Sequence, residues 1–244
     1  MMTSLVVRMA APLQAWGAAE GGIYRRTAKY PTKSGVYGLL ANAAGYDYSD
    51  GTLMWEGLSL GVRIDEPGAL ITDFHKSTEV DGKTTRIGYR SYLTSAAFVC
   101  VLEGNSRDVH KAYSVLKNPA RLVYLGRKTC IPSIPLVDRH SVSDMTTQDV
   151  FTSYEWIPYT QSQFNERAYA KMSRKYSGDK ELILDTVVDA PLSEEGAFYL
   201  RDYPSSTVPR EYGKRYVAIK NVAIANPFYV KSNTDLHDPM EGLV

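Results

Sequence analysis

The chain has 244 residues, and its 28 Lys and Arg residues nearly balance its 27 Asp and Glu residues. A hydrophobic fraction of 44% and a charged fraction of 23% are ordinary for a globular protein of one large or two small domains. The two cysteines are too few for a disulfide framework, the N-terminus does not resemble a signal peptide, and no apolar run approaches the roughly 18 residues of a membrane span. We therefore expect a cytoplasmic protein with no membrane partner.

The positive charge is unevenly distributed along the chain. Four windows contain Lys and Arg but neither Asp nor Glu, namely residues 21–46, 82–102, 109–137 and 167–178. Many of the 18 tyrosines stand beside basic residues, as in Tyr24-Arg25-Arg26 and Tyr89-Arg90. This pattern suits single-stranded nucleic acid, because guanidinium groups follow phosphates while rings stack on bases. Tyrosines that pack within a sheet give the same pattern, so both interpretations stay open.

The first forty-five residues predict a strand, a basic loop and a helix. Residues 5–9 form an apolar run, which we expect to be a buried strand that ends at Pro12. A helix is expected from Pro31 to Gly45, with Thr32 or Ser34 as its cap and apolar residues at helical spacing. Free N–H groups at a helix start favour an anion, and this start is surrounded by basic residues. They are Arg25, Arg26, Lys29 and Lys33.

The remaining elements follow from shorter patterns. Residues 60–64 and 96–102 are expected to be strands, and residues 107–116 a helix that ends before Asn118-Pro119. Residues 71–75 and 85–92 flank Asp81-Gly82, which predicts a projecting hairpin. Residues 122–125 are expected to form a short strand before the loop Gly126-Arg127-Lys128. Strands are also expected at 181–188 and 215–223, and residues 226–244 offer few core candidates.

This order of elements predicts an α+β fold of the ferredoxin-like or RRM type. Residues 1–125 would form an RRM-like domain that carries a β-hairpin thumb at about 71–92. Residues 126–244 would add the basic glycine loop and a smaller, β-rich C-terminal region. The aromatic RNA-binding signature of an ordinary RRM does not occur in the sequence.

The sequence contains no complete motif for nucleotide binding, metal binding or catalysis. Lys33-Ser34 would need glycines at positions 32 and 27 to form a P-loop, and threonine occupies both. The four histidines have no His or Cys at metal-ligand spacing, so we expect neither a metal nor a cofactor. A metal-independent ribonuclease with His110, Lys111 and Tyr46 is conceivable, but no histidine is placed beside a nucleophile. We therefore expect a protein that is not an enzyme.

Five motifs, taken in order and spacing, resemble the CasD-type subunits of type I-E CRISPR Cascade complexes, which belong to the RAMP superfamily. The resemblance covers roughly residues 3–140 well and the remainder more weakly. Residue 11 is Ala where Gly is usual in the family, and the C-terminal tail is longer. The motifs are Ala11–Gly17, Tyr30–Leu40, Asp73-Phe74-His75, Tyr89–Leu93 and Tyr124–Cys130.

The resemblance implies a non-catalytic subunit of this antiviral complex, with an RRM-like domain and a hairpin thumb. It implies that the protein holds the 5′ handle of CRISPR RNA, caps that end of Cascade, and contacts the backbone subunit and the large subunit that reads target DNA. In other subtypes the related protein processes precursor CRISPR RNA as an endoribonuclease, which is the alternative. The residues expected at the RNA are Gln14, Arg25, Arg26, Lys29, Lys33, Ser34, Gly35, Tyr89, Arg90, Tyr92, Gly126, Arg127 and Lys128.

Overall fold

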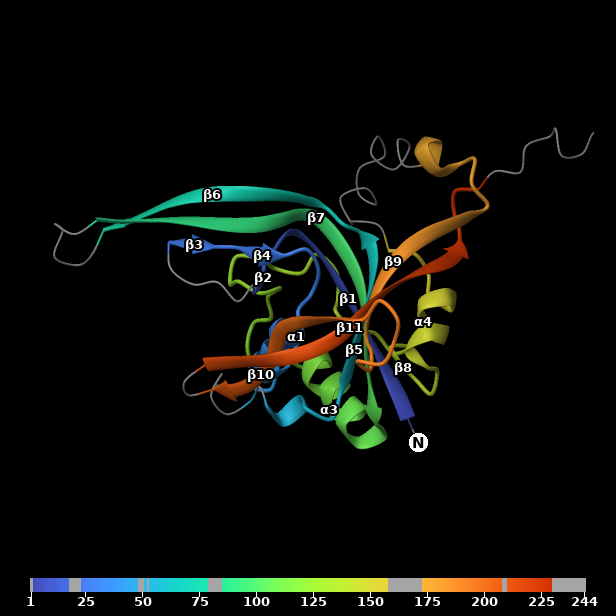
Figure 1. The fold of residues 1–244 in the computed structure, drawn as a ribbon, viewed down its shortest axis with the longest axis horizontal. Helices are drawn as coiled ribbons and strands as arrows, with labels where there is room; N and C mark the ends of the chain where they lie inside the picture. Colours follow the sequence, from blue (N-terminus) through green and yellow to red (C-terminus); the bar gives the residue numbers. More distant parts are fainter. Residues whose placement is uncertain are drawn as a thin grey trace, which may run out of the picture.

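The protein is built around one antiparallel sheet with the strand order β10-β11-β9-β5-β7-β1-β8 (Figure 1). The computed structural model describes residues 2–17, 23–47, 51, 53–78, 85–157, 173–207 and 210–229. The strands of this sheet are β1 (Met2–Gln14), β5 (Ser59–Glu66), β7 (Thr85–Asn105), β8 (Val142–Ser143), β9 (Glu181–Asp189), β10 (Phe198–Thr207) and β11 (Arg210–Ala225).

A long hairpin projects from one end of the sheet, as the sequence predicted (Figure 1). It consists of β6 (Ala69–Thr78) and the first half of β7, paired antiparallel from Ala69 opposite Thr94 to Thr78 opposite Thr85. A two-residue turn at Asp81-Gly82 would impose this register, although residues 79–84 lie outside the described residues. The short β3 (Tyr24–Arg25) runs parallel to β7, and β2 (Trp16–Gly17) pairs with β4 (Thr27–Ala28).

The two longer helices form where the sequence predicted them. Helix α1 (Lys33–Ala43) begins after Thr32, whose hydroxyl accepts a hydrogen bond from the Gly35 N–H at 3.2 Å, and it is followed by Gly45 with a φ of +81°. Helix α3 (Ser106–Lys117) is capped by Asn105. The shorter elements are α4 (Thr147–Ser153) and η1 (Leu53–Trp55). No helix within the described ranges is long and apolar enough to cross a membrane.

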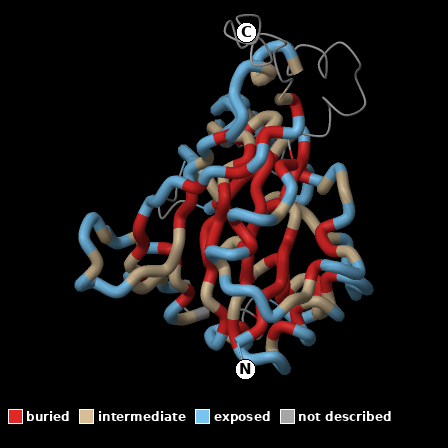
Figure 2. The backbone as a smooth tube through the Cα atoms, turned by 90° about the vertical axis from the view of Figure 1, so that its right-hand side faces the viewer, coloured by how far each residue is buried: buried red, intermediate tan, exposed pale blue. Residues whose placement is uncertain are grey.

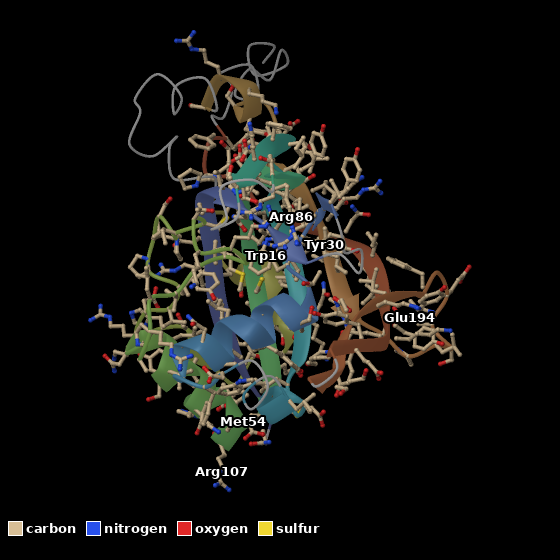
Figure 3. All side chains as sticks on the ribbon, turned by 90° about the vertical axis from the view of Figure 1, so that its left-hand side faces the viewer. Trp16, Tyr30, Met54, Arg86, Arg107 and Glu194 are labelled. Atoms are coloured by element: carbon tan, nitrogen blue, oxygen red, sulfur yellow. The ribbon has the colours of Figure 1, made fainter. Side chains whose placement is uncertain are left out.

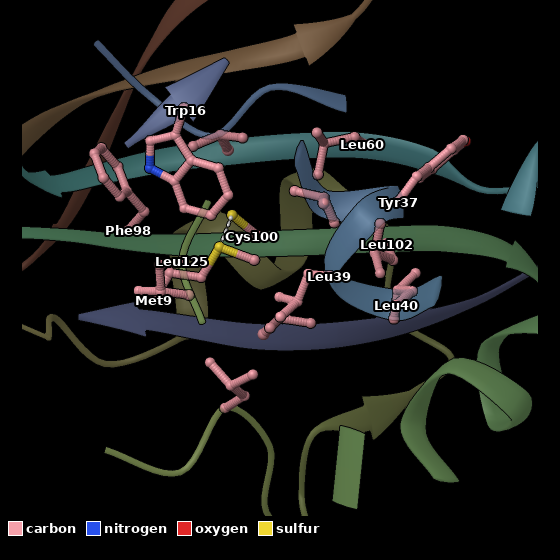
Figure 4. Close-up of a cluster of buried hydrophobic side chains, with 14 of the residues drawn as sticks. Met9, Trp16, Tyr37, Leu39, Leu40, Leu60, Phe98, Cys100, Leu102 and Leu125 are labelled. Carbon is pink, nitrogen blue, oxygen red and sulfur yellow. Dashed lines mark hydrogen bonds between the residues drawn. The ribbon is translucent and has the colours of Figure 1, made fainter. Parts of the chain in front are cut away.

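Both faces of the central strands are covered by apolar side chains, because successive residues of a strand point to opposite faces. On one face Leu5, Val7 and Met9 join the apolar sides of α1 and α3 in the larger core (Figure 4). On the other face Val6 belongs to a second cluster with α4 and the segment that follows it. Figure 2 shows the buried residues gathered along the central strands.

Four details of the sequence prediction were wrong. Strand β1 does not end at Pro12, because the paired residues Ala11 and Leu13 flank the proline and its missing N–H interrupts little. The expected strands 85–92 and 96–102 are one strand, which bends at Ser95, where φ is 54°. Residues 122–125 form no strand: Leu125 accepts from the Ala15 N–H and donates to the Cys130 carbonyl. Strand β10 was not predicted, because its residues are largely polar.

The region after residue 125 contributes to the same sheet as the region before it. Strand β9 pairs with β5 at Gly61–Arg63 and with β11 along its whole length. Behind this junction the fully buried Arg63 donates to both carboxylate oxygens of Asp65, at 2.7 and 2.8 Å. Arg63 also donates to the carbonyls of Phe151 and Tyr154. These hydrogen bonds connect the end of α4 to β5. Residues 230–244, most of the predicted tail, lie outside the described residues.

Candidate nucleic-acid interface

The short strand β3 brings one basic window beside another. In its parallel pairing with β7, Tyr24 lies opposite Tyr89 and Arg25 lies opposite Arg90. The Tyr89 N–H donates to the Ile23 carbonyl at 2.8 Å, which fixes this register. Arg25 is exposed and Arg90 is half-buried, and neither guanidinium has a hydrogen bond or ion pair with any residue in the described ranges. Two guanidinium groups without a carboxylate partner favour an anionic ligand.

These arginines line a groove of about 510 Å³ at the hairpin, which we call the basic groove. Its other charged or titratable lining residues are Arg86 and His75, and the backbone of Gly88 forms part of its wall. In the hairpin register, His75 lies opposite Gly88 and Asp73 lies opposite Arg90. Asp73 is exposed and forms no ion pair with the described residues, so the groove carries a net positive charge. Arg107 lies at the lower edge of the molecule in Figure 3, away from Arg86.

Exposed aromatic rings lie next to the basic groove. The rings of Tyr24 and Tyr89 stack with centroids 4.9 Å apart and planes 9° apart. Phe74 meets Tyr89 edge-on at 5.7 Å, and both Tyr24 and Phe74 are more than half exposed. By strand alternation these rings lie on the other face of the hairpin from the Arg90 side chain, so they offer unpaired bases an open π-face at the edge of the basic groove, which Tyr89 also lines.

Arg127 holds this region together. Its guanidinium donates to the Ser91 carbonyl at 3.0 Å and to the Arg25 carbonyl at 2.8 Å, and it lies 4.6 Å from the centroid of the Tyr92 ring. The side chain therefore connects β7 to β3 and is already engaged within the chain. Tyr92 is buried beneath it and is not available for stacking. The exposed Lys128 follows directly and is free of such contacts with described residues.

Gly126 has a structural reason to be glycine. Its φ is +91°, and a Cβ placed there would lie 1.5 Å from the carbonyl oxygen of Ala15. The backbone at Gly126 therefore approaches the chain's own β1–β2 junction closely. The loop from Gly126 to Cys130 is closed by the Cys130 N–H, which donates to the Arg127 carbonyl.

The start of α1 differs from the expected anion site, because the chain supplies its own carboxylates. The Lys33 N–H donates to Asp202 at 2.9 Å, and the buried Lys33 ammonium pairs with Asp189 at 2.8 Å. Arg215 completes the network by binding Asp189 at 2.6 Å and Asp202 at 2.6 Å. Burial would raise the pKa of Asp189, but Lys33 and Arg215 hold it below its ordinary value. Lys33 therefore contacts β9 and β10 in place of the predicted phosphate, and the Gly35 N–H donates to the Thr32 hydroxyl of its own helix cap.

Gln14 is a core residue rather than a reader of bases. Its side chain is fully buried and donates to the carbonyls of Met9 and Ala96, at 3.2 and 2.8 Å. Its amide oxygen accepts from the indole N–H of Trp16 at 3.1 Å, so every polar atom of the pair is satisfied. Trp16 is fully buried, as expected, and the absence of a Cβ at Gly35 lets α1 approach it.

The predicted residues thus fall into separate groups. Arg25, Tyr89 and Arg90 meet at the basic groove, with Arg127 behind them. Arg26 is exposed beside Arg25, whereas Lys29 lines a different groove. Four residues at or beside the basic groove were not among those predicted to contact RNA. These are Tyr24, Phe74, His75 and Arg86.

A local signal for these residues exists in the hairpin. The two-residue turn that the sequence predicts at Asp81-Gly82 also predicts which residues of β6 and β7 are opposite one another, and alternation then assigns their faces. Arg86, Gly88 and Arg90 share one face with Ser77, His75 and Asp73, and Tyr89 shares the other face with Phe74. Only the position of β3 could not be obtained in this way.

The suggested nuclease residues lie elsewhere. His110 is exposed on α3, where its Nδ1 contacts the carbonyl of Ser106 at 2.8 Å, and Lys111 lies over the ring of Trp55. Tyr46 is partly exposed after α1, and its carbonyl accepts from Arg121. Among the described residues, no group of three His, Cys, Asp or Glu is placed to hold a metal ion.

Comparisons with known proteins agree on one family. The family model described as "CRISPR-associated protein (Cas_Cas5)" matches residues 4–218. The chain is 28% identical to "CRISPR system Cascade subunit CasD" of Escherichia coli K12 over 160 residues, which are 56% of this chain and 70% of that protein. The resemblance expected from the five sequence motifs is therefore confirmed.

Two solved structures have a similar fold. One, titled "CRISPR RNA-guided surveillance complex", has a TM-score of 0.70 at 23% identity, with 95% of each chain covered. The other, titled "Crystal structure of Cas protein", has a TM-score of 0.66 at 26% identity and covers 94% of this chain and 98% of that one. The first likeness is evidence of fold alone. Together they agree with a mixed α/β architecture dominated by its sheet.

Proposed function

This chain belongs to the CRISPR-associated Cas5 family, and on that premise we propose that it is a CasD-type Cascade subunit that binds the 5′ handle of CRISPR RNA in the basic groove. The observation that carries the proposal is the register of β3 on β7, which sets Arg25 beside Arg90. The guanidinium groups neutralise handle phosphates, and the Tyr24–Tyr89 stack receives an unpaired base. Lys128 and Arg26 extend the positive surface.

The assembly role follows from the resemblance to CasD. In this proposal the protein caps the 5′ end of the complex and contacts its backbone subunit and its large subunit, so that it meets target DNA only indirectly. The part of the sheet ordered β8-β1-β7-β5, with α1 and α3 on one face, corresponds to the ferredoxin-like or RRM-like domain. The β6–β7 hairpin is the thumb, and the protein works in the cytoplasm.

A binding titration tests the site. The variant with Arg25→Ala and Arg90→Ala is expected to bind a labelled handle RNA at least about tenfold more weakly than the unaltered chain, because it loses two phosphate contacts. Arg107→Ala is the matched control, since Arg107 is an exposed arginine that lies away from Arg86 of the basic groove (Figure 3). If the double variant and the control bind alike, the handle does not occupy the basic groove.

The alternative function is metal-independent cleavage of precursor CRISPR RNA. One observation favours it: His75 lines the basic groove together with Arg25, Arg86 and Arg90, so a titratable group lies where RNA would bind. Incubation of the purified protein with repeat RNA in EDTA distinguishes the two functions. The binding function predicts intact RNA, whereas site-specific cleavage that His75→Ala abolishes would establish the nuclease.

A further inference from the structure

Strand β9 has a neighbour on both sides over only part of its length. All of β9 pairs with β11, but only Thr186–Val188 pair with Gly61–Arg63 of β5. Beyond Arg63, β5 continues toward the hairpin, and Figure 1 shows β9 and the hairpin leaving the centre of the sheet in opposite directions. Residues 181–185 therefore form an edge within an otherwise continuous sheet.

The direction of the backbone groups at this edge follows from the ladder. The Asn226 N–H donates to the Lys180 carbonyl, and the Ala190 N–H donates to the Tyr216 carbonyl, so the even-numbered residues of β9 bond to β11. The odd-numbered residues Glu181, Ile183 and Asp185 consequently point their N–H and C=O groups away from β11. Among the described residues, the ladder between β5 and β9 pairs none of these three residues. An unpaired edge of this kind is a template for another strand.

The edge opens onto a groove of about 1010 Å³, which we call the β9 groove. One wall includes Ile64, Leu70 and Leu93, and the other includes Ile183 and Ile219. Leu70 and Ile183 are each 64% exposed and Ile219 is 55% exposed, although all three are large aliphatic side chains. Exposed aliphatic walls beside an unpaired edge indicate a surface that is covered in the working assembly.

The charge of the β9 groove is opposite to that of the basic groove. Asp179, Glu181 and Asp185 are exposed carboxylates along its β9 side, and Lys29 is its one exposed cation among the described lining residues. Phosphates would be repelled here, whereas Lys or Arg side chains of a protein would be attracted. The occupant that fits is an extended protein segment in which apolar side chains alternate with basic ones.

We propose that the β9 groove receives such a segment from another protein subunit of the complex, which adds to residues 181–185 as a strand. Its backbone would pair with Glu181, Ile183 and Asp185, and its basic side chains would face the carboxylates. The inference rests on the proposed function only in taking the partner to be a subunit of the same complex. RNA and protein would then bind to different sides of this chain.

Hydrogen exchange measures the edge directly. In the isolated chain, the Ile183 and Asp185 amides should exchange freely while the Leu184 amide, which bonds to β11, is protected. In the assembled complex, the Ile183 and Asp185 amides should become at least about tenfold more protected. Addition of handle RNA alone should leave them unchanged. Protection already present in the isolated chain would show that the edge is paired internally, and exchange unchanged by assembly would show that it stays open; either result overturns the proposal.

A matched pair of variants tests strand addition. Ile183→Pro removes an N–H that β11 does not use, so the isolated chain is expected to keep its fold, but an added strand loses its bond. Ile183→Ala removes the apolar side chain and keeps the N–H. We expect Ile183→Pro to lower incorporation into the complex by at least about tenfold and Ile183→Ala to lower it less. Incorporation of Ile183→Pro at the unaltered level would overturn the proposal.

A charge variant covers the case in which proline disturbs folding. Glu181→Lys with Asp185→Lys alters two exposed side chains, so it should fold, yet it should join the complex poorly and bind handle RNA no less tightly. Full incorporation of this variant would contradict the proposal, as would sedimentation showing that two copies of the chain pair through β9. Failure of the handle titration would instead contradict the proposed function, so the two failures are distinguishable.

Discussion

Arg25 lies opposite Arg90 although 64 residues separate them in the chain, because β3 runs parallel to β7. The two positive groups come from separate acid-free windows, and an anion bound between or beside them would offset their repulsion. The connection is maintained by the Tyr89 N–H, the Tyr24–Tyr89 stack and the Arg127 guanidinium. The stack and the Arg127 guanidinium each give a separate prediction.

Arg127 is expected to act through Arg25 rather than by touching RNA. Arg127→Ala removes the hydrogen bond that fixes the Arg25 carbonyl, so β3 loses its position and the variant should bind handle RNA about as weakly as Arg25→Ala does. The variant that carries both Arg25→Ala and Arg127→Ala should then lose little more affinity for handle RNA than either single variant. Handle titrations of all four proteins measure this coupling, and fully additive losses would mean that the two arginines act independently.

Tyr89 is expected to contribute by stacking. Tyr89→Ala should weaken handle binding by about 1–3 kcal/mol without changing its dependence on salt, because a ring contributes no charge. Tyr89→Phe keeps the ring beside Tyr24 and should retain most of the affinity. Equal binding by the alanine and phenylalanine variants would exclude a stacking role.

Gly126 and Gly38 form a matched pair for stability. Gly126→Ala should lower the free energy of unfolding by roughly 3 kcal/mol or more, since it places a Cβ on the Ala15 carbonyl at a positive φ. Gly38→Ala should raise it by about 1 kcal/mol, because nothing lies within 4 Å of the new Cβ in the middle of α1. Denaturant unfolding of both variants measures these changes. If Gly126→Ala leaves the free energy of unfolding unchanged, the Gly126 backbone does not lie against the Ala15 carbonyl.

The Lys33 network gives a prediction about pH. Lys33 and Arg215 lower the pKa of Asp189, so the stability that its ionised carboxylate contributes is complete above the unfolded-state pKa of about 3.9 and is lost as the pH falls through the lower folded-state pKa. Asp189→Asn should reduce the free energy of unfolding at pH 7 by about 3 kcal/mol. The difference from the unaltered protein should shrink as the pH falls from about 5 toward 2. A difference that is constant with pH would contradict this account.

The same network predicts what Lys33 does not do. Lys33→Met should lower stability by a few kcal/mol, because it leaves the Asp189 carboxylate with one cation in place of two. The folded variant should still bind handle RNA as the unaltered protein does, since the ammonium faces Asp189 and not the basic groove. If Lys33→Met is as stable as the unaltered protein but binds handle RNA more weakly, Lys33 contacts the RNA and the prediction is wrong.

Local patterns were sufficient for much of the fold. The helical spacing of Val36, Leu39 and Leu40 predicted α1 and its buried face, and Asp81-Gly82 predicted the hairpin. Strands β5, β9 and β11 were found from apolar runs within a few residues of their ends. In each of these cases the deciding interactions are between residues that are close in sequence or repeat with a fixed period.

The sequence could not show which charges are taken up inside the chain. Lys33 has the local surroundings of a phosphate ligand, but its partners Asp189 and Asp202 are 156 and 169 residues away. Arg127 likewise finds its acceptors at Ser91 and Arg25. A basic window predicts that a region is positive, whereas long-range packing decides which of its cations remain available.

The salt dependence of handle binding tests the central claim most directly. Each phosphate contact to a single strand contributes about 0.7 to the slope of log affinity against log salt. If Arg25 and Arg90 both contact phosphates, the double alanine variant should have a slope smaller by about 1.4 than the unaltered protein, and Arg107→Ala should have an unchanged slope. An unchanged slope for the double variant would show that the arginine pair of β3 and β7 does not hold the RNA.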